Sequence, residues 1–259
     1  MRIALNVEYD GTDFCGWQTQ KDCRSVQQEV ERAVSTVADQ PVSVVCAGRT
    51  DTGVHATGQI IHFDTDVIRN ERNWVLGCNA NLPRDASITW AKEVKDDFHA
   101  RFSATARSYR YVILNRMTRS AIYRNRVSWH HQPLDEMRMN MAAKSFLGER
   151  DFTSFRALAC QAKHAVRTMH EINVERNGDF IIIDVRANAF LHHMVRNIAG
   201  TLIAIGEGEQ DIDWVQELLD AKDRAQAGIT APPHGLYLVN VEYPPEFELP
   251  AGCAAPTFY

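Results

Sequence analysis

The chain has 259 residues, of which 45% are hydrophobic and 24% are charged, as is ordinary for a soluble globular protein. This length fits one large domain or two small ones. The 28 basic and 33 acidic side chains give a net charge of -5. That sign disfavours a protein that coats nucleic acid nonspecifically, although it permits a local basic groove. The apolar share excludes an intrinsically disordered chain.

Six cysteines are spread along the chain, and no two of them form a C-x-x-C pair. Their gaps match no zinc or haem pattern, so we interpret them as reduced thiols of a cytoplasmic protein. Polar residues interrupt the first eight positions too soon for a signal peptide. No apolar stretch approaches the roughly 20 residues that a membrane span requires. The cysteines are Cys15, Cys23, Cys46, Cys78, Cys160 and Cys253.

The first hundred residues predict strands with two interspersed helices. Residues 2–9 alternate between apolar and polar side chains, as a half-buried strand does. Ser25 begins a helix with an apolar stripe at helical spacing, and Gln28 completes a capping box. A short strand is predicted at residues 42–46 and another at residues 59–63. A helix near residues 71–80 and a strand at residues 88–94 follow.

The second half predicts the same kinds of element without sequence repetition. Strands are expected at residues 108–114 and 235–243, and helices at residues 134–147, 193–204 and 212–221. Gly148 is a natural stop for the first of these helices. Two further strands, at about 170–175 and 180–187, flank Asn177-Gly178, which is a strong hairpin signal. Residues after Pro244 predict an extended tail of low order.

Helices interleaved with hairpins favour an α+β fold over a doubly wound parallel sheet. The sequence predicts an N-terminal α+β unit at residues 1–104, a C-terminal α+β unit at residues 105–245 and a tail at residues 246–259. The change between the units falls near residues 98–107.

Residues 47–58 form the most informative segment, because three glycines, an arginine, an aspartate and a histidine lie between two predicted strands. Glycines allow the backbone to approach a ligand closely, and loops on rigid scaffolds often carry function. We therefore consider Asp51 a candidate catalytic carboxylate. From local chemistry alone, a glycine-rich turn in which Asp51 caps its own backbone amides explains the segment equally well.

The tripeptide Asp51-Thr52-Gly53 also occurs around the catalytic aspartates of aspartic proteases. That mechanism requires two aspartates that share one proton. The chain has no second Asp-Thr-Gly, and Asp64-Thr65-Asp66 does not match the pattern. The sequence therefore disfavours a protease.

Several motifs, in order along nearly the whole chain up to Tyr243, resemble those of the A-type tRNA pseudouridine synthases, which act on the anticodon arm. Each motif is weak by itself, but the ordered set is specific. The motifs are Tyr9-Asp10-Gly11-Thr12 with Phe14, Gly16-Trp17-Gln18 and Gln20; Gly48 to Ala56; Phe98 to Ala104 and Tyr109-Arg110-Tyr111; Phe152 to Phe155; and Phe190 to Asn197.

The resemblance implies a role for each of four residues. Asp51 corresponds to the family's nucleophile, and Tyr109 to the tyrosine that stacks on the target uracil. Arg196 corresponds to the basic residue that pairs with the aspartate. Arg49 corresponds to an arginine thought to help displace the target base. The resemblance further implies two units of the RNA-recognition, ferredoxin-like type, joined in one broad, mostly antiparallel sheet flanked by helices, with a cleft between them.

The implied reaction converts uridine to pseudouridine at tRNA positions 38, 39 and 40. It conserves atoms and involves no redox change, so we expect neither a cofactor nor a metal. A carboxylate must stay ionised, and a guanidinium beside it lowers its pKa and fixes its geometry. The target base must leave its stack, and an aromatic face such as that of Tyr109 compensates part of that cost. The resemblance also implies a homodimer that contacts one tRNA with both subunits.

Each candidate also has an ordinary structural explanation. Tyr109 is otherwise a packing residue, Arg196 a surface helix residue, Arg49 a plain phosphate contact and Trp17 a core residue. We expect His192 and His193 to point to different faces of a helix, which excludes an adjacent metal pair. A tRNA-binding module of the same fold without catalysis is the alternative from another functional class. Six basic residues have no predicted convergence: Lys21, Arg24, Arg101, Arg107, Arg110 and Arg156.

Overall fold

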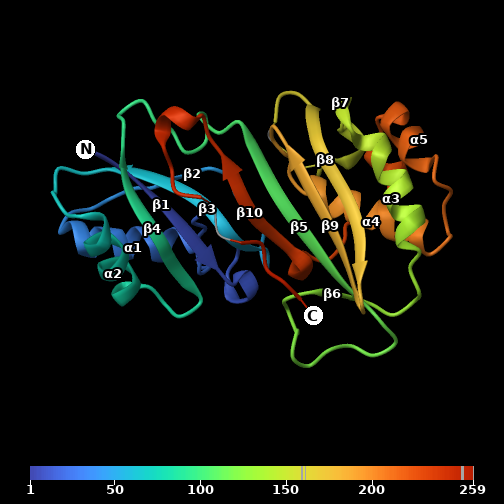
Figure 1. Ribbon diagram of the computed structural model, residues 1–259, viewed down its shortest axis with the longest axis horizontal. Helices are drawn as coiled ribbons and strands as arrows, with labels where there is room; N and C mark the ends of the chain where they lie inside the picture. Colours follow the sequence, from blue (N-terminus) through green and yellow to red (C-terminus); the bar gives the residue numbers. More distant parts are fainter. Residues whose placement is uncertain (159, 161, 252–253, 259) are drawn as a thin grey trace. The chain divides into compact units, whose positions relative to one another are not determined.

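The computed structural model describes residues 1–158, 160, 162–251 and 254–258, and its elements appear in Figure 1. The chain forms two compact units. The first comprises Met1–Thr105 and Tyr237–Pro256, and the second comprises Ala106–Leu236 together with the chain end from Thr257. The predicted first unit ended at residue 104. The sequence predicted residues 237–245 in the second unit, whereas the structure groups Tyr237–Pro256 with the first.

The first unit is built on strands in the order β4-β1-β3-β10. Central strand β1 (Arg2–Tyr9) pairs antiparallel with β3 (His55–Asp64) and with β4 (Ala86–Val94). Strand β10 (Leu236–Glu242) runs parallel to β3, and two-residue β2 (Val45–Cys46) pairs antiparallel with it. The alternation at residues 2–9 thus correctly predicted β1.

Two helices pack on the sheet of the first unit: α1 (Val26–Ala38) and α2 (Glu71–Asn81) (Figure 1). The hydroxyl of Ser25 accepts the N–H of Gln28 at 3.3 Å, as the capping pattern predicted. The apolar stripe of α1 is buried from Val26 to Ala38. Burial of one apolar face against a sheet is what stabilises a helix of this length in a protein.

The second unit is built on strands in the order β5-β9-β8-β7. They are β5 (Ala106–Asn115), β9 (Phe180–Ala187), β8 (Val166–Asn177) and β7 (Gly148–Asp151), and all their pairings are antiparallel. The predicted hairpin is confirmed between β8 and β9, where Gly178 has φ +57°. Three-residue β6 (Ser128–His130) lies parallel to the end of β5.

Within the described residues, the α-helices of the second unit are α3 (Glu136–Ala143), α4 (Met194–Gly206) and α5 (Trp214–Ala221). Helices α3 and α4 pack on each other, and they contact β8 and β5 respectively (Figure 1). The α+β class is confirmed, with mostly antiparallel strands in both units. Among the described residues, no helix is long and apolar enough to cross a membrane.

The end of the chain is more ordered than predicted. The ring of Phe258 is buried and packs at 5.8 Å from Tyr123 and 5.7 Å from Phe180, measured between ring centroids. Burial of an aromatic side chain removes a large apolar area from water, which holds this segment in place. The prediction of a tail of low order is therefore wrong for Phe258.

The prediction that all cysteines are reduced thiols is wrong for Cys15 and Cys23, which form a disulfide. The N–H of Cys15 donates to the carbonyl of Arg24, and Gln20 pairs with Cys23 in an isolated bridge. This tight loop brings the two Cα atoms to 6.2 Å, a separation that a disulfide spans. Thiols are free at Cys46, Cys78 and Cys160, whereas Cys253 lies outside the described residues.

Candidate active site

The glycine-rich segment leaves β2 after Cys46 and enters β3 at His55, so its last four residues are strand and not loop. Its start is fixed by a double contact, in which Gln59 accepts the Gly48 N–H and donates to the Gly48 carbonyl. Its middle is fixed by the Tyr9 hydroxyl, which lies 2.7 Å from that of Thr50. The loop at residues 47–54 is thus held on the N-terminal side of Asp51.

Gly16 supplies the closest support for this loop. A Cβ atom at Gly16 would lie 2.6 Å from the carbonyl oxygen of Thr50 and 3.0 Å from the carbonyl carbon of Asp51. The next residue, Trp17, donates its N–H to the same Thr50 oxygen at 3.0 Å. Trp17 is buried, which confirms it as a core residue. The motif around Gly16 therefore positions the backbone that carries Asp51.

Gly16→Ala is expected to lower catalytic activity at least about tenfold, because the added methyl group displaces the backbone of Asp51. Gly16 also has φ +92°, so the substitution costs about 1–3 kcal/mol of stability. Gly148→Ala is the matched control, since Gly148 has φ +84° and nothing within 4 Å of an added Cβ. Single-turnover assays should show an activity loss only in Gly16→Ala. Urea unfolding should show a stability loss in both variants, larger in Gly16→Ala because its Cβ overlaps the Thr50 backbone. Full activity in Gly16→Ala would contradict the supporting role.

Asp51 is half-buried and lies in a turn closed by the Val54 N–H, which donates to the Asp51 carbonyl at 3.1 Å. Gly53, with φ +77°, allows this turn. Arg49, two residues before Asp51, is exposed. Burial raises the pKa of the Cys46 thiol to about 11, and the positive charges of Arg49 and Arg101 oppose that shift. The charges of both guanidinium groups therefore act at the start of the loop.

A buried histidine supports the strand that follows this loop. His62 on β3 is only 4% exposed, and its Nδ1 accepts the N–H of Ala100 at 3.1 Å. Burial lowers the pKa of His62 to about 4, helped by the charges of Arg2 and His99 and opposed by Asp64. The side chain is thus neutral at pH 7, as its acceptor role requires.

The free energy of unfolding is expected to fall by about 1–2 kcal/mol between pH 7 and pH 5 because of His62. The unfolded histidine binds a proton near pH 6.5, whereas the folded one does so only near pH 4. The stabilisation is therefore complete above pH 6.5 and is lost as the pH falls through that window. His62→Asn keeps an acceptor for Ala100 but does not titrate, so its urea-unfolding free energy should depend less on pH. The same pH dependence in both proteins would contradict this assignment.

Tyr109 lies on β5 opposite Val185, and its ring packs edge-to-face on Phe190 with centroids 4.9 Å apart. Tyr111 shares that face of β5, because residues two apart in a strand point the same way. The Tyr111 hydroxyl donates to the carbonyl of Pro232 at 2.8 Å and lies 2.7 Å from the Ser128 hydroxyl. Tyr109 is thus an aromatic side chain on a rigid strand.

Arg196 occupies the first turn of α4. Its Nε donates to the carbonyl of Ala231 at 2.8 Å, and the Ala231 N–H donates back to the carbonyl of Arg196 at 3.1 Å. Burial raises the pKa of Tyr111, and the positive charge of Arg196 opposes that shift. The second unit therefore brings Arg196 and the face of β5 that carries Tyr109 close together.

A network around buried Asn197 holds this end of α4. Its amide donates to the carbonyl of Phe155 at 2.8 Å, and its oxygen accepts from Arg224 at 3.1 Å and from Thr230 at 2.7 Å. A fully satisfied buried network of this kind fixes a unique local conformation. Arg196, the preceding residue, is positioned by the same network.

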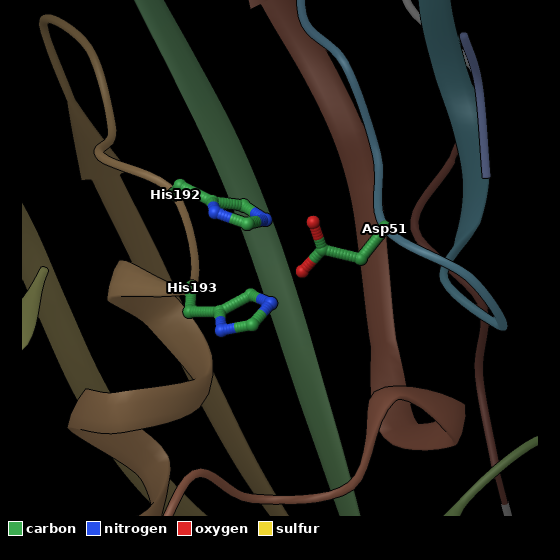
Figure 2. Close-up of side chains that lie close together, drawn as sticks. All are labelled: Asp51, His192 and His193. Atoms are coloured by element: carbon green, nitrogen blue, oxygen red, sulfur yellow. The ribbon is translucent and has the colours of Figure 1, made fainter. Parts of the chain in front are cut away.

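The interpretation of His192 and His193 as helix residues that point apart is wrong. Both precede α4, and His193 adopts the left-handed conformation with φ +62°. Their ring centroids lie 4.0 Å apart, and Figure 2 shows the two imidazoles side by side. The left-handed residue turns the backbone immediately before the helix, which brings adjacent side chains together. Figure 2 also shows Asp51 on its loop after β2.

Several basic residues that the sequence left scattered have structural partners. Arg24 pairs with Asp85 at 2.7 Å, and Arg110 pairs with Asp184 at 2.8 Å. Arg107 donates to the carbonyl of Asn188 at 2.9 Å. Arg24 and Arg110 are therefore ion-pair residues of the fold.

Comparison with known proteins decides the family. A family model described as tRNA pseudouridine synthase matches residues 5–103 and 142–244. The chain belongs to the tRNA pseudouridine synthase family. It is 57% identical over 258 residues to a tRNA pseudouridine synthase A of Shewanella amazonensis, covering 100% of this chain and 99% of that protein. Proteins of the same name from Shewanella woodyi and Hydrogenovibrio crunogenus are 58% and 56% identical, over 100% and 96% of this chain and 99% and 95% of their own.

The chain is therefore an isomerase that converts uridine to pseudouridine in tRNA. The resemblance of the ordered motifs is confirmed, and the protease interpretation of Asp51-Thr52-Gly53 is excluded. Of the four candidate residues, Arg49 and Asp51 lie in the first unit, and Tyr109 and Arg196 lie in the second. Their catalytic roles stay predictions.

Proposed function

We propose that this enzyme isomerises uridines 38, 39 and 40 in the anticodon arm of tRNA, with Asp51 as its catalytic carboxylate. The observation that carries the proposal is the identity of more than half the residues with tRNA pseudouridine synthase A proteins, over the full chain. The loop that holds Asp51 agrees with it, because contacts on its N-terminal side and the turn closed by Val54 fix this carboxylate at a bend of the backbone.

The proposed roles follow the balance of the reaction. The bond between N1 of uracil and C1′ of ribose breaks, and the bond between C5 and C1′ forms. The proton on C5 leaves, and N1 takes up a proton, so the product is an isomer of the substrate. Asp51 supplies the carboxylate for the glycosidic exchange, and Arg196 is its basic partner. Tyr109 stacks on the detached uracil, and Arg49 assists displacement of the base from its stack.

Recognition of three neighbouring positions favours reading of tRNA shape over base sequence, which is usual for structured RNA. We include in the proposal a homodimer whose two subunits contact one tRNA, and a cytoplasmic location, where tRNA is used. Reduced cysteines do not support this location, because Cys15 and Cys23 form a disulfide. Sedimentation of the free enzyme and of its tRNA complex measures the number of subunits.

Incubation with unmodified tRNA transcripts tests the proposal. Chemical mapping should show pseudouridine at positions 38, 39 and 40 where the transcript has uridine there, and none after replacement of those uridines by cytidine. Product elsewhere in the tRNA would contradict the proposed positions. Binding of tRNA without any product would favour the non-catalytic module.

A further inference from the structure

The turn at residues 98–103, which follows β4, presents an aromatic side chain to solvent. Phe98 at its start is buried, with its ring 5.0 Å from Tyr243 and 5.1 Å from Phe247. Phe102 near its end is 76% exposed. Packing in the core therefore accounts for an aromatic side chain at Phe98 but not at Phe102.

The backbone of this turn is tied by its own side chains. The Nδ1 atom of His99 lies 3.2 Å from the Arg101 nitrogen and 3.1 Å from the Phe102 nitrogen, and it accepts from both. The Ser103 hydroxyl accepts the N–H of His99, and the Ser103 N–H donates to the His99 carbonyl. The ring of Phe102 lies 4.3 Å from that of His99. The backbone at Phe102 is thus tied, and its ring lies against His99, which reduces the entropy lost on binding.

The turn lies close to the start of the loop that carries Asp51. The N–H of Ala100 donates to His62, and His62 is the cross-strand partner of Val45 in β2. Strand β2 ends at the next residue, Cys46, where the loop begins. A ligand that contacts Phe102 therefore lies beside the entry to the catalytic loop.

A guanidinium group accompanies this aromatic ring. The guanidinium carbon of Arg101 lies 5.6 Å from the centroid of Phe102, and the charges of Arg101 and Arg49 both act on the Cys46 thiol. The acidic residues just before the turn, Asp96 and Asp97, act on the charge of Arg2. An exposed aromatic ring beside an arginine suits a single-stranded RNA segment, in which bases and phosphates alternate.

We propose that Phe102 stacks on an unpaired base of the tRNA substrate beside the target uridine, while Arg101 contacts a neighbouring phosphate. The assignment rests on the proposed function, since it requires an anticodon loop as the ligand. It makes Phe102 a substrate-positioning residue in addition to Tyr109, with a different base as its partner.

Phe102→Leu tests the stacking, because leucine keeps an apolar side chain but lacks the aromatic face. The variant should bind tRNA about 5- to 150-fold more weakly at fixed salt, the range that corresponds to one lost stacked base. Phe102→Trp should bind at least as tightly as the wild type. The control Ile68→Ala removes another exposed apolar side chain of the first unit, 87% exposed, and should leave binding unchanged.

Anticodon stem-loops that each lack one base identify the partner. One abasic position should weaken binding of the wild type but leave binding of Phe102→Leu unchanged, because the stacked pair is already lost. Equal sensitivity of both proteins at every position would overturn the proposal.

The remaining outcomes separate this inference from the function on which it rests. Wild type that forms pseudouridine, together with Phe102→Leu that binds tRNA normally, would overturn the stacking and leave the function intact. Wild type that forms no pseudouridine would overturn the function itself. Loss of dimers in Phe102→Leu, measured by sedimentation without tRNA, would assign this surface to a second copy of the chain and overturn the proposal.

Discussion

Asp51→Asn is expected to abolish pseudouridine formation, with a rate at least about 10⁴-fold below that of the wild type. Asparagine keeps the size of the side chain and its capacity to accept hydrogen bonds, but it has no negative charge for the glycosidic exchange. Single-turnover assays with an anticodon-arm substrate measure the rate. The affinity for tRNA should change little, because the contacts that hold the loop come from Tyr9, Gly48 and Gln59.

Asp66→Asn is the matched control, since Asp66 is an exposed aspartate of the same unit. It should retain the activity of the wild type. Equal rates for Asp51→Asn and Asp66→Asn would show that Asp51 is not the catalytic carboxylate. Failure of Asp51→Asn to bind tRNA would indicate a role in holding the loop instead.

Arg196→Met is expected to lower turnover about 10²- to 10³-fold, as removal of one oriented donor does in other active sites. The KM for tRNA should change much less. The guanidinium is held by the Ala231 carbonyl and by the fold around Asn197, so it is oriented before substrate binds. Arg196→Lys keeps the charge but loses the planar fork, and should recover only part of the activity.

Arg150→Met provides the control for loss of a positive charge in the second unit, because Arg150 is exposed on β7. Its kinetic constants should equal those of the wild type. Unchanged turnover and weaker tRNA binding in Arg196→Met would make Arg196 a phosphate contact and would contradict its role as partner of the carboxylate.

Elements with a strong local signal were predictable from the sequence. The alternation at residues 2–9, the Ser25 cap and the Asn177-Gly178 turn each correspond to an observed feature. Short strands were missed: β6 and β7 have three and four residues, too few for a periodic pattern. Such strands exist because of the neighbours with which they pair, and pairing partners are not written in local sequence.

In the candidate site, too, features with a local sequence signal were predictable and features that depend on distant contacts were not. Motif order predicted roles for Asp51, Tyr109 and Arg196, but no local pattern indicated the disulfide or the packing of Gly16 on Thr50. Phe102 belonged to a recognised motif, yet its exposure depends on how His99 folds the turn. These properties arise from contacts between residues distant in sequence, or from a single backbone conformation.

The discontinuous first unit has a consequence for synthesis of the chain on the ribosome. In this unit, β3 pairs in parallel with β10. About 130 residues of the second unit lie between residue 105 and β10 in the sequence. At about 5–20 residues per second, the first unit waits roughly 7–26 s for its last strand. During that interval the edge of β3 next to the Asp51 loop lacks its parallel partner β10, and Gly58 lacks the Val239 backbone against which it packs. A fragment that stops at residue 104 would keep that edge open permanently, whereas a permuted chain that begins at residue 237 would close it first.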